Sequence, residues 1–382
     1  MTYLEISALS GTMSGDEATL FSLLSERAAR LSEPPNTLEN EEDGHNNEEI
    51  SCEKMLERFG ENYVKELTGF TDAQVMEILE VCKETLKPVG PGRRYRDMKS
   101  RLIVYLVWLT SGWTVKKIGC LFDVAKATIQ RTLTYVMSGL TESLKVAYLP
   151  KSIRDINISS QFKNFPQAIG AVDATLIPVQ KPSDRENEGL YYSGKHHAHG
   201  AKVQVVVSSD GFAIHVSKVI PGRRHDAFLF RISGVDSFMK DSIKIGGTTR
   251  AFRPALLGDS GYIGLEDIYP ELIVTRKRSK NKELSTEDEQ WNSRLHSDRV
   301  LVENYFGRLK SVFGILARPY RGALNALEDV VITCICLLNM MLKANPLRKQ
   351  DAEESELSSE ATLSMMLDSP GDPPSSKRGP KK

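Results

Sequence analysis

The sequence has few cysteines and no long uninterrupted apolar segment. Its five cysteines are odd in number and scattered along the chain, at Cys52, Cys82, Cys120, Cys334 and Cys336. This pattern gives no disulfide framework and is typical of a protein from a reducing, intracellular compartment. The longest apolar run, residues 330–342, is shorter than a bilayer requires, so it predicts a buried helix and no membrane association.

The N-terminus lacks a charged leader followed by an apolar run, so no secretory signal is expected. The chain also lacks net charge overall, although the charges are unevenly distributed. Residues 1–50 carry a net charge of −9, residues 351–370 carry −6 and residues 371–382 carry +3, which leaves +12 for residues 51–350. A basic centre between acidic ends is expected of a nucleic-acid-binding core. The alternative is positive charge spread evenly over a solvated surface.

Composition divides the chain into four regions. Residues 1–50 are acidic and poor in aromatic residues, and residues 346–382 are rich in Ser, Pro and acids, so both are predicted to be disordered tails. Residues 51–145 have helical periodicity, and Thr71 and Gln74 have the form of a capping box. Residues 165–345 alternate between short apolar runs and helical segments. This last pattern predicts an α/β domain with a mixed sheet and flanking helices.

The helical region contains a pattern typical of a helix-turn-helix. Helices are predicted over residues 100–109, 114–122 and 125–140, and Thr114 is a suitable N-cap for the second. Asp123 occupies the tight turn before the third helix, where Gly is frequent. Four polar side chains on the third helix are predicted to contact DNA bases or phosphates: Lys126, Thr128, Gln130 and Arg131. The alternative is a three-helix bundle whose polar face is only solvated.

Three carboxylates in the α/β region lie in settings that suggest one shared site. Asp173 and Asp259 lie on or directly after short apolar runs bounded by Gly and Pro, which predict buried strands at residues 168–179 and 255–258. Glu303 lies on a predicted helix with apolar residues at helical spacing. Carboxylates gathered at one sheet edge repel each other, and a divalent cation would remove that repulsion. Oxygen ligands favour Mg²⁺ or Mn²⁺ over Zn²⁺.

Each of these acids also has a purely structural interpretation. Asp173 and Asp259 are each also suited to cap a strand end or a turn, and Gly258 and Gly261 near Asp259 favour that role there. Glu303 lies four residues after Arg299 and is placed for an ordinary helical ion pair. The apolar residues around Glu303 predict a largely buried helix, however, where a Glu needs a partner or a metal.

The remaining elements complete the predicted α/β domain. Strands are expected at residues 202–208, 213–219 and 272–275, with a hairpin turn between the first two. Helices are expected at residues 226–239, 266–272, 286–313 and 326–343. Asp226 is placed to cap the helix that it begins. Basic residues of this region are predicted to line a DNA path: Lys195, Lys202, Arg223, Arg224, Arg308 and Lys310.

Two other chemistries were weighed from local motifs. Residues 196–199 hold three histidines, and His197 and His199 would point the same way on a strand, but no further Cys or His completes a tetrahedral zinc site. The Gly-Asp-Ser-Gly sequence at 258–261 is similar to the serine segment of trypsin-like proteases. No matching His segment or disulfide framework accompanies it, so a serine hydrolase is disfavoured.

Five blocks in a fixed order resemble the DDE-type transposases of the PIF/Harbinger group and their endonuclease-like relatives. The blocks are Val-Asp-Ala-Thr at 172–175, Tyr-Tyr-Ser-Gly-Lys-His-His-Ala-His-Gly-Ala-Lys-Val-Gln at 191–204, Pro-Gly-Arg-Arg-His-Asp at 221–226, Leu-Gly-Asp-Ser-Gly-Tyr at 257–262 and Val-Glu-Asn-Tyr-Phe-Gly-Arg-Leu-Lys at 302–310. Any one block would be a weak signal, whereas five in order are specific. The resemblance spans residues 66–345.

The resemblance implies an RNase H-like core in which Asp173, Asp259 and Glu303 hold two Mg²⁺ or Mn²⁺ ions for DNA strand cleavage and transfer. It also implies DNA as a partner, a separate Myb-like DNA-binding protein and, by analogy, a homodimer. The basic cluster at residues 377–382 and the DNA substrate lead us to expect a nuclear location, with a cytoplasmic pool as the alternative. A domesticated, catalytically silent DNA-binding or scaffold protein is the alternative function.

Overall fold

The short apolar runs pair into one mixed sheet in the computed structural model, which describes residues 51–86, 98–156, 160–240, 253–278 and 283–345. All of these residues belong to one unit, Glu48–Lys382. The two predicted tails, residues 1–50 and 346–382, lie outside the described residues. The mixed α/β architecture predicted from the alternating pattern is therefore confirmed for the part of the chain that is described.

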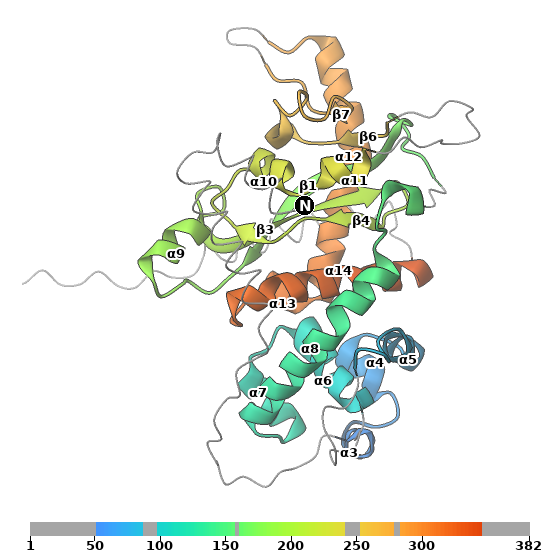
Figure 1. Cartoon of the computed structure of the whole chain (residues 1–382), viewed down its shortest axis with the longest axis vertical. Helices are drawn as coiled ribbons and strands as arrows, with labels where there is room; N and C mark the ends of the chain where they lie inside the picture. The colour runs from blue at the N-terminus through green and yellow to red at the C-terminus, as the bar shows by residue number, and fades with distance from the viewer. Residues whose placement is uncertain (1–50, 87–97, 157–159, 241–252, 279–282, 346–382) are drawn as a thin grey trace, which may run out of the picture. The chain divides into compact units, whose positions relative to one another are not determined.

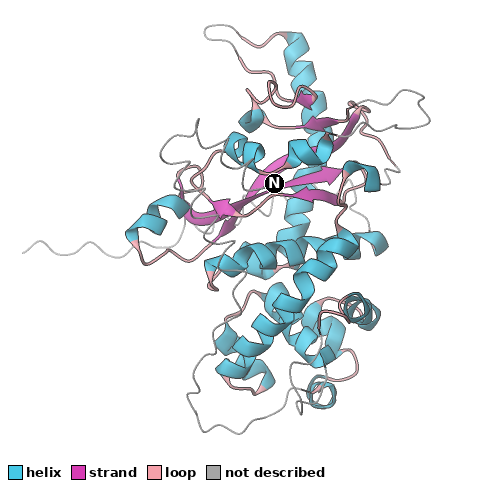
Figure 2. Ribbon diagram, viewed as in Figure 1, coloured by secondary structure: helices cyan, strands magenta, loops and turns pink. Residues whose placement is uncertain are grey.

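The sheet is built around two long strands, β1 (Ala168–Pro178) and β3 (Ala198–Ser208), which are antiparallel (Figure 2). The strands β6 (Ala255–Leu257) and β7 (Leu272–Ile273) add parallel to β1, one after the other. The order is β2-β3-β1-β6-β7, where β2 is Tyr192–Ser193. The strands β4 (Ala213–Val216) and β5 (Ile220–Pro221) also pair with β3, both antiparallel.

Helices cover both faces of this sheet because its strands are apolar on both sides. On one face, α12 (Thr286–Val312) packs on β1, β3 and β6, and α14 (Leu327–Ala344) contacts β4. On the other face, α10 (Asp226–Ile232) contacts β3 and belongs to a second buried cluster with α11 (Val235–Met239) (Figure 1). The strand that carries Asp173 and the strand that precedes Asp259 therefore belong to a sheet that is covered by helices on both faces.

The N-terminal region is helical, as predicted. Its helices are α3 (Cys52–Phe59), α4 (Tyr63–Thr68), α5 (Asp72–Val81), α6 (Met98–Ser111), α7 (Val115–Phe122) and α8 (Lys126–Tyr148). The predicted capping box is present, since the Gln74 backbone N–H donates to Thr71 Oγ1 and the Thr71 N–H donates to Gln74 Oε1. Helix α8 packs on α14, where the Thr141 and Thr333 hydroxyls lie 3.2 Å apart.

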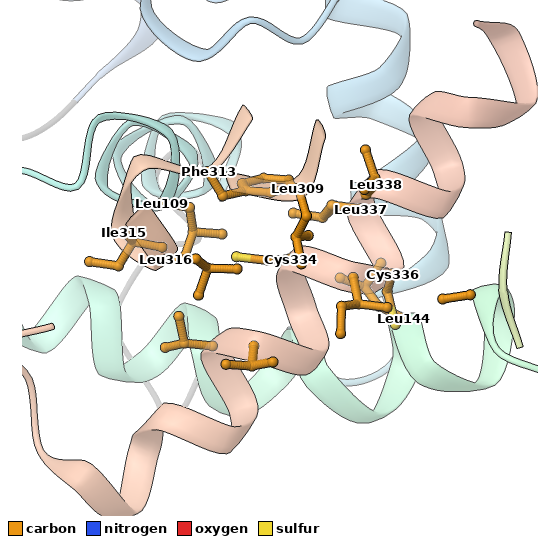
Figure 3. Close-up of a cluster of buried hydrophobic side chains, with 14 of the residues drawn as sticks. Leu109, Leu144, Leu309, Phe313, Ile315, Leu316, Cys334, Cys336, Leu337 and Leu338 are labelled. Atoms are coloured by element: carbon orange, nitrogen blue, oxygen red, sulfur yellow. The ribbon is translucent and has the colours of Figure 1, made fainter. Parts of the chain in front are cut away.

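The main hydrophobic core joins helices that are distant in the sequence. Figure 3 shows buried side chains of α6, α8, α12, α14 and the short α13 (Gly314–Ala317) gathered in one cluster, among them Leu109, Leu316 and Cys334. The segment Leu324–Ala344 is 21 residues long and apolar enough to cross a membrane by composition. The apolar run at residues 330–342 is shorter than α14. The predicted buried helix is confirmed, because most residues of α14 lie inside the protein.

Several predicted elements differ from those observed. The helix expected over residues 226–239 is two helices, because Gly234 adopts a left-handed φ of 76° between them. Residues 266–271 form turns and not a helix, and β7 begins at Leu272. Strand β3 begins four residues earlier than predicted and includes His199, whereas His197 lies outside it with φ of 48°. The helix α9 (Arg185–Tyr191) and strands β2 and β5 were not predicted.

Asp123 gives a first testable prediction, because it occupies a left-handed conformation with φ of 57° at the end of α7. Asp tolerates this region better than bulky residues do, and Gly adopts it without strain. Asp123→Val should lower the free energy of unfolding by about 1–2 kcal/mol, and Asp123→Gly should leave it unchanged or higher. Urea denaturation of both variants tests this, and equal stability of the two would contradict it.

Candidate active site

The register of two neighbouring parallel strands places two aspartates side by side. Ala171 of β1 is paired with Leu257, the last residue of β6. Asp173 lies two residues further along β1, and Asp259 lies two residues after Leu257, just beyond the end of β6. Parallel neighbours are about 4.8 Å apart, so Asp259 follows β6 beside the part of β1 that carries Asp173. The strand pairing therefore brings the segments that carry Asp173 and Asp259 close together.

The turn after β6 fixes the side chain of Asp259. Asp259 caps a short 3₁₀ helix, Ser260–Tyr262, and its Oδ1 accepts a hydrogen bond from the Gly261 N–H at 2.8 Å. The capping role weighed from the sequence is thus present. It occupies one carboxylate oxygen and does not prevent the other from binding a ligand.

A further aspartate, Asp226 at the start of α10, lies beside Asp259. A Cβ on Gly261 would lie 2.9 Å from Asp259 Oδ1 and 3.2 Å from Asp226 Oδ2, so both carboxylates face that glycine. The expected helix-capping role of Asp226 is wrong, because His225 is the N-cap residue and Asp226 is already helical. Its Oδ1 instead accepts a hydrogen bond from Lys202 Nζ at 2.8 Å.

Glu303 lies on α12 and is linked to Asp173 through one arginine. Arg299 is 7% exposed at its side chain and lies 3.7 Å from Asp173 Oδ2 and 3.9 Å from Glu303 Oε1. The i,i+4 pair weighed from the sequence therefore exists, and Arg299 also reaches β1. The Nε atom of Arg299 is buried and has no hydrogen-bond partner among the described residues.

The pKa of Asp173 is raised to about 6, mainly by burial, while Arg299 opposes the rise and the negative charges of Asp259 and Asp226 add to it. A carboxyl with such a pKa holds its proton more tightly than one in water. The raised pKa therefore reflects mainly the burial of this carboxyl, which the nearby Arg299 offsets only in part.

The carboxylates of Asp173, Asp259 and Glu303 are of the type that binds a hard divalent cation. In this structure, however, the three are not arranged as ligands of one ion. Within the described residues, no three His, Cys, Asp or Glu side chains are grouped so that they could hold one metal ion. Asp173 and Asp259 offer carboxylate oxygens, which are the donors that Mg²⁺ and Mn²⁺ prefer. Glu303 is turned to Arg299, so it joins that set only when this ion pair opens.

The predicted DNA-contacting residues fall into two groups. Exposed side chains include Lys126, Gln130, Arg131, Lys195, Arg223 and Arg308, and Thr128 and Arg224 are partly buried. Lys202 and Lys310 are engaged inside the protein. Lys202 Nζ donates to Asp226 and to the Arg224 carbonyl, and Lys310 Nζ donates to the Leu176 carbonyl at 3.0 Å. Burial lowers the pKa of Lys310, because the partly buried position disfavours the charged ammonium.

Comparison with known proteins agrees with the geometry of this edge. Residues 172–339 match the sequence model of a family described as DDE superfamily endonuclease. The chain is 26% identical over 259 residues to a protein of Microchaete diplosiphon described as a probable transposase for insertion sequence element IS702, covering 67% of this chain and 86% of that protein. No solved structure matches the chain. Asp173, Asp226, Asp259 and Glu303 all lie within the family match.

Sequence reasoning did not assign Asp226 to the site. The signal was present, since His225 and Asp226 end one of the five blocks, directly after two arginines. An Asp at the start of a helix is readily interpreted as a helix cap. Only the hydrogen bond from Lys202 of β3, 24 residues away in sequence, distinguishes a position near the other carboxylates from that capping role.

Proposed function

We propose that the protein is a divalent-metal-dependent DNA endonuclease of the transposase type, with an RNase H-like catalytic domain. The β1–β6 register supports this most directly, because it brings Asp173 and Asp259 together within the family match. The topology agrees with the proposal: antiparallel β1, β3 and β4 are followed by parallel β6 and β7. The assignment to the PIF/Harbinger group rests on the five sequence blocks.

In this proposal the acids of the sheet edge hold Mg²⁺ or Mn²⁺, which neutralises charge on a DNA phosphodiester and activates the attacking hydroxyl. Asp173 and Asp259 are the ligands, with Glu303 from α12 as the third and Asp226 beside them. Arg299 keeps Asp173 and Glu303 from repelling each other in the metal-free protein. The rigid sheet fixes the acids, which matters because phosphoryl transfer depends mainly on positioning and charge neutralisation.

Nicking of supercoiled plasmid by the purified full-length protein tests this function. The expected result is conversion to open circles that requires Mg²⁺ or Mn²⁺ and stops with EDTA. Joining of DNA ends would be measured on the same samples by recovery of strand-transfer products. Nicking that is unaffected by EDTA would contradict the proposal.

A catalytically silent DNA-binding or scaffold protein is the second candidate function. The ion pairs of Arg299 favour it, because a buried guanidinium already compensates two of the three predicted metal ligands. Isothermal titration of the protein with Mn²⁺ separates the two functions. Binding that is lost on Asp173→Asn supports the endonuclease, whereas DNA binding without any bound metal supports the scaffold.

We also propose that α7 and α8 form a helix-turn-helix that contacts DNA. The connection between them is three residues long, and Lys126, Gln130 and Arg131 are exposed on the first turns of α8. Lys126→Ala and Arg131→Ala should each weaken duplex binding and reduce the slope of log affinity against log salt by about 1. Fluorescence anisotropy over a salt series measures this slope, and Glu142→Ala on the same helix is the matched control. Unchanged slopes would support a plain helical bundle.

The remaining proposals concern the setting of this activity. DNA is the partner, a Myb-like protein assists target binding, and the protein acts as a homodimer in the nucleus. Light scattering on the purified protein tests the dimer, and imaging of a fluorescent fusion with and without residues 377–382 tests the location.

A further inference from the structure

A cavity of about 1010 Å³ lies next to the carboxylates and has no role in the metal chemistry proposed above. Its walls come from α9, the β2–β3 hairpin and residues 222–226 after β5. Lys202 and Asp226 line it, so it adjoins the place where Asp226 and Asp259 face Gly261. Its size is that of a site for a molecule of nucleotide size or larger, since such pockets span roughly 300–1,000 Å³.

The cavity lining carries unpaired positive charge, because its carboxylates are already paired with lysines. Glu188 is paired with Lys181 at 2.7 Å, and Asp226 is paired with Lys202 at 2.8 Å. Arg185, Lys195 and Arg223 line the same cavity, are exposed, and form no ion pair with a carboxylate of the described residues. Unpaired cations around a concave surface favour an anionic ligand such as a phosphate.

One wall of the cavity presents an aromatic ring. Tyr192 is 42% exposed and is paired in register with His199 across the hairpin. The two rings meet edge to face with centroids 5.4 Å apart, so the His199 ring does not stack flat on Tyr192. His199 Nε2 is buried and has no hydrogen-bond partner within the described part of the chain. An exposed ring beside cations is the arrangement on which single-stranded bases stack.

The cavity is held open by its backbone. The Gly222 N–H donates to the Gly200 carbonyl, and the Arg223 N–H donates to the Leu190 carbonyl, so the loop is fixed against β3 and α9. Gly189 and Gly194 line the cavity, and a Cβ on either would meet no atom within 4 Å. A side chain added at Gly189 would therefore enter open space without disturbing a packed neighbour.

We propose that this cavity, the Tyr192 cavity, binds one unpaired nucleotide of the DNA strand next to the cleaved bond. Its base stacks on Tyr192, and its phosphates lie near Arg185, Lys195 and Arg223. A base inside a duplex has both faces covered by its neighbours, so only an unpaired or extruded base can use the ring. The inference rests on the proposed function for its location beside the reacting phosphate, and it makes the protein selective for distorted or single-stranded DNA at that position.

Binding to three duplexes of one sequence tests the proposal by fluorescence anisotropy in EDTA, where cleavage does not occur. The first duplex is fully paired, the second carries one bulged thymidine, and the third carries an abasic bulge, which keeps the bend and phosphates without the base. The unsubstituted protein should prefer the thymidine bulge over the abasic bulge by about tenfold, the effect expected of one base stacked on an aromatic ring.

Tyr192→Ala should remove this preference, and Tyr192→Phe should retain it because the ring remains. Gly189→Trp should also remove it by filling the cavity, whereas Gly189→Ala should not, and this pair keeps the test valid if Tyr192→Ala fails to fold. Loss of preference in Tyr192→Ala and Gly189→Trp supports the proposal. An unsubstituted protein without the preference, or variants that keep it, would overturn the nucleotide site and leave the metal-dependent nicking untouched.

Discussion

Asp259→Asn should nick supercoiled plasmid at least ~1,000-fold more slowly than the unsubstituted protein, because it removes a full negative charge from the proposed metal site. Asn retains a side-chain oxygen for the Gly261 N–H, so the turn after β6 should remain as it is. The variant therefore changes charge while the local backbone is preserved. Rates of nicking in Mg²⁺ and in Mn²⁺ measure the effect.

Asp267→Asn is the matched control, because Asp267 is exposed and lies in the same segment eight residues further on. It should nick within about twofold of the unsubstituted protein, since exposed substitutions away from a site have small effects. Thermal melting of the two variants should be similar. Equal nicking by Asp259→Asn and Asp267→Asn would mean that the activity comes from another site or from a contaminant.

The strands that carry the site were predictable because buried strands have a simple sequence pattern. The apolar runs before Asp173 and Asp259 gave β1 and β6 to within one residue at each end. Helix α12 was also predicted to within one residue, because apolar residues recur along it at helical spacing. These patterns are local in the sequence, so they can be interpreted without knowing which segments pack against each element.

Contacts between distant segments were not predictable from the same patterns. The pairing of Asp226 with Lys202 depends on how α10 packs on β3, and no periodicity encodes it. The Tyr192 cavity likewise requires α9 and β2, which are too short to have a periodic signal. Gly234 interrupts a helical pattern in the sequence. The helical periodicity on both sides of it nevertheless predicted one continuous helix.

Glu303 shows a second limit of sequence reasoning. Its spacing from Arg299 predicts a helical ion pair, and its apolar neighbours predict a ligand in a buried setting. The ion pair with Arg299 is present, and the role of Glu303 as a ligand stays a prediction. Arg299 also reaches Asp173 on β1, a tertiary contact that helical spacing alone does not predict.

Asp173→Asn should raise the free energy of unfolding of the metal-free protein at pH 7.5 and have little effect at pH 4. The pKa of Asp173 is raised to about 6, so the folded protein holds this proton more tightly than the unfolded chain does. Its stabilising contribution is therefore complete below about pH 4 and is lost as pH rises through 6. Above that window the folded state carries an unfavourable buried charge, which Asn does not have.

The expected gain is about 1–3 kcal/mol at pH 7.5, because a shift from 3.8 to about 6 corresponds to roughly 3 kcal/mol. The side chain is 22% exposed, and Arg299 loses one of its two carboxylate partners in the variant, so the lower half of this range is favoured. Urea denaturation in EDTA at pH 4 and pH 7.5 measures the gain, with Asp267→Asn as the control. A difference that does not change with pH would show that Arg299 already compensates Asp173.

The same titration links the stability of the protein to its proposed metal. A carboxylate must lose its proton to bind a cation, so Mg²⁺ should bind more weakly at pH 5.5 than at pH 7.5. Mg²⁺ should also stabilise the unsubstituted protein at pH 7.5 and leave Asp173→Asn unchanged, since only a ligand that prefers the folded state raises its stability. Metal binding would then relieve the charge that the sheet edge concentrates. A site that is unfavourable when empty and stabilised when occupied is expected where function, not folding, selects the residues.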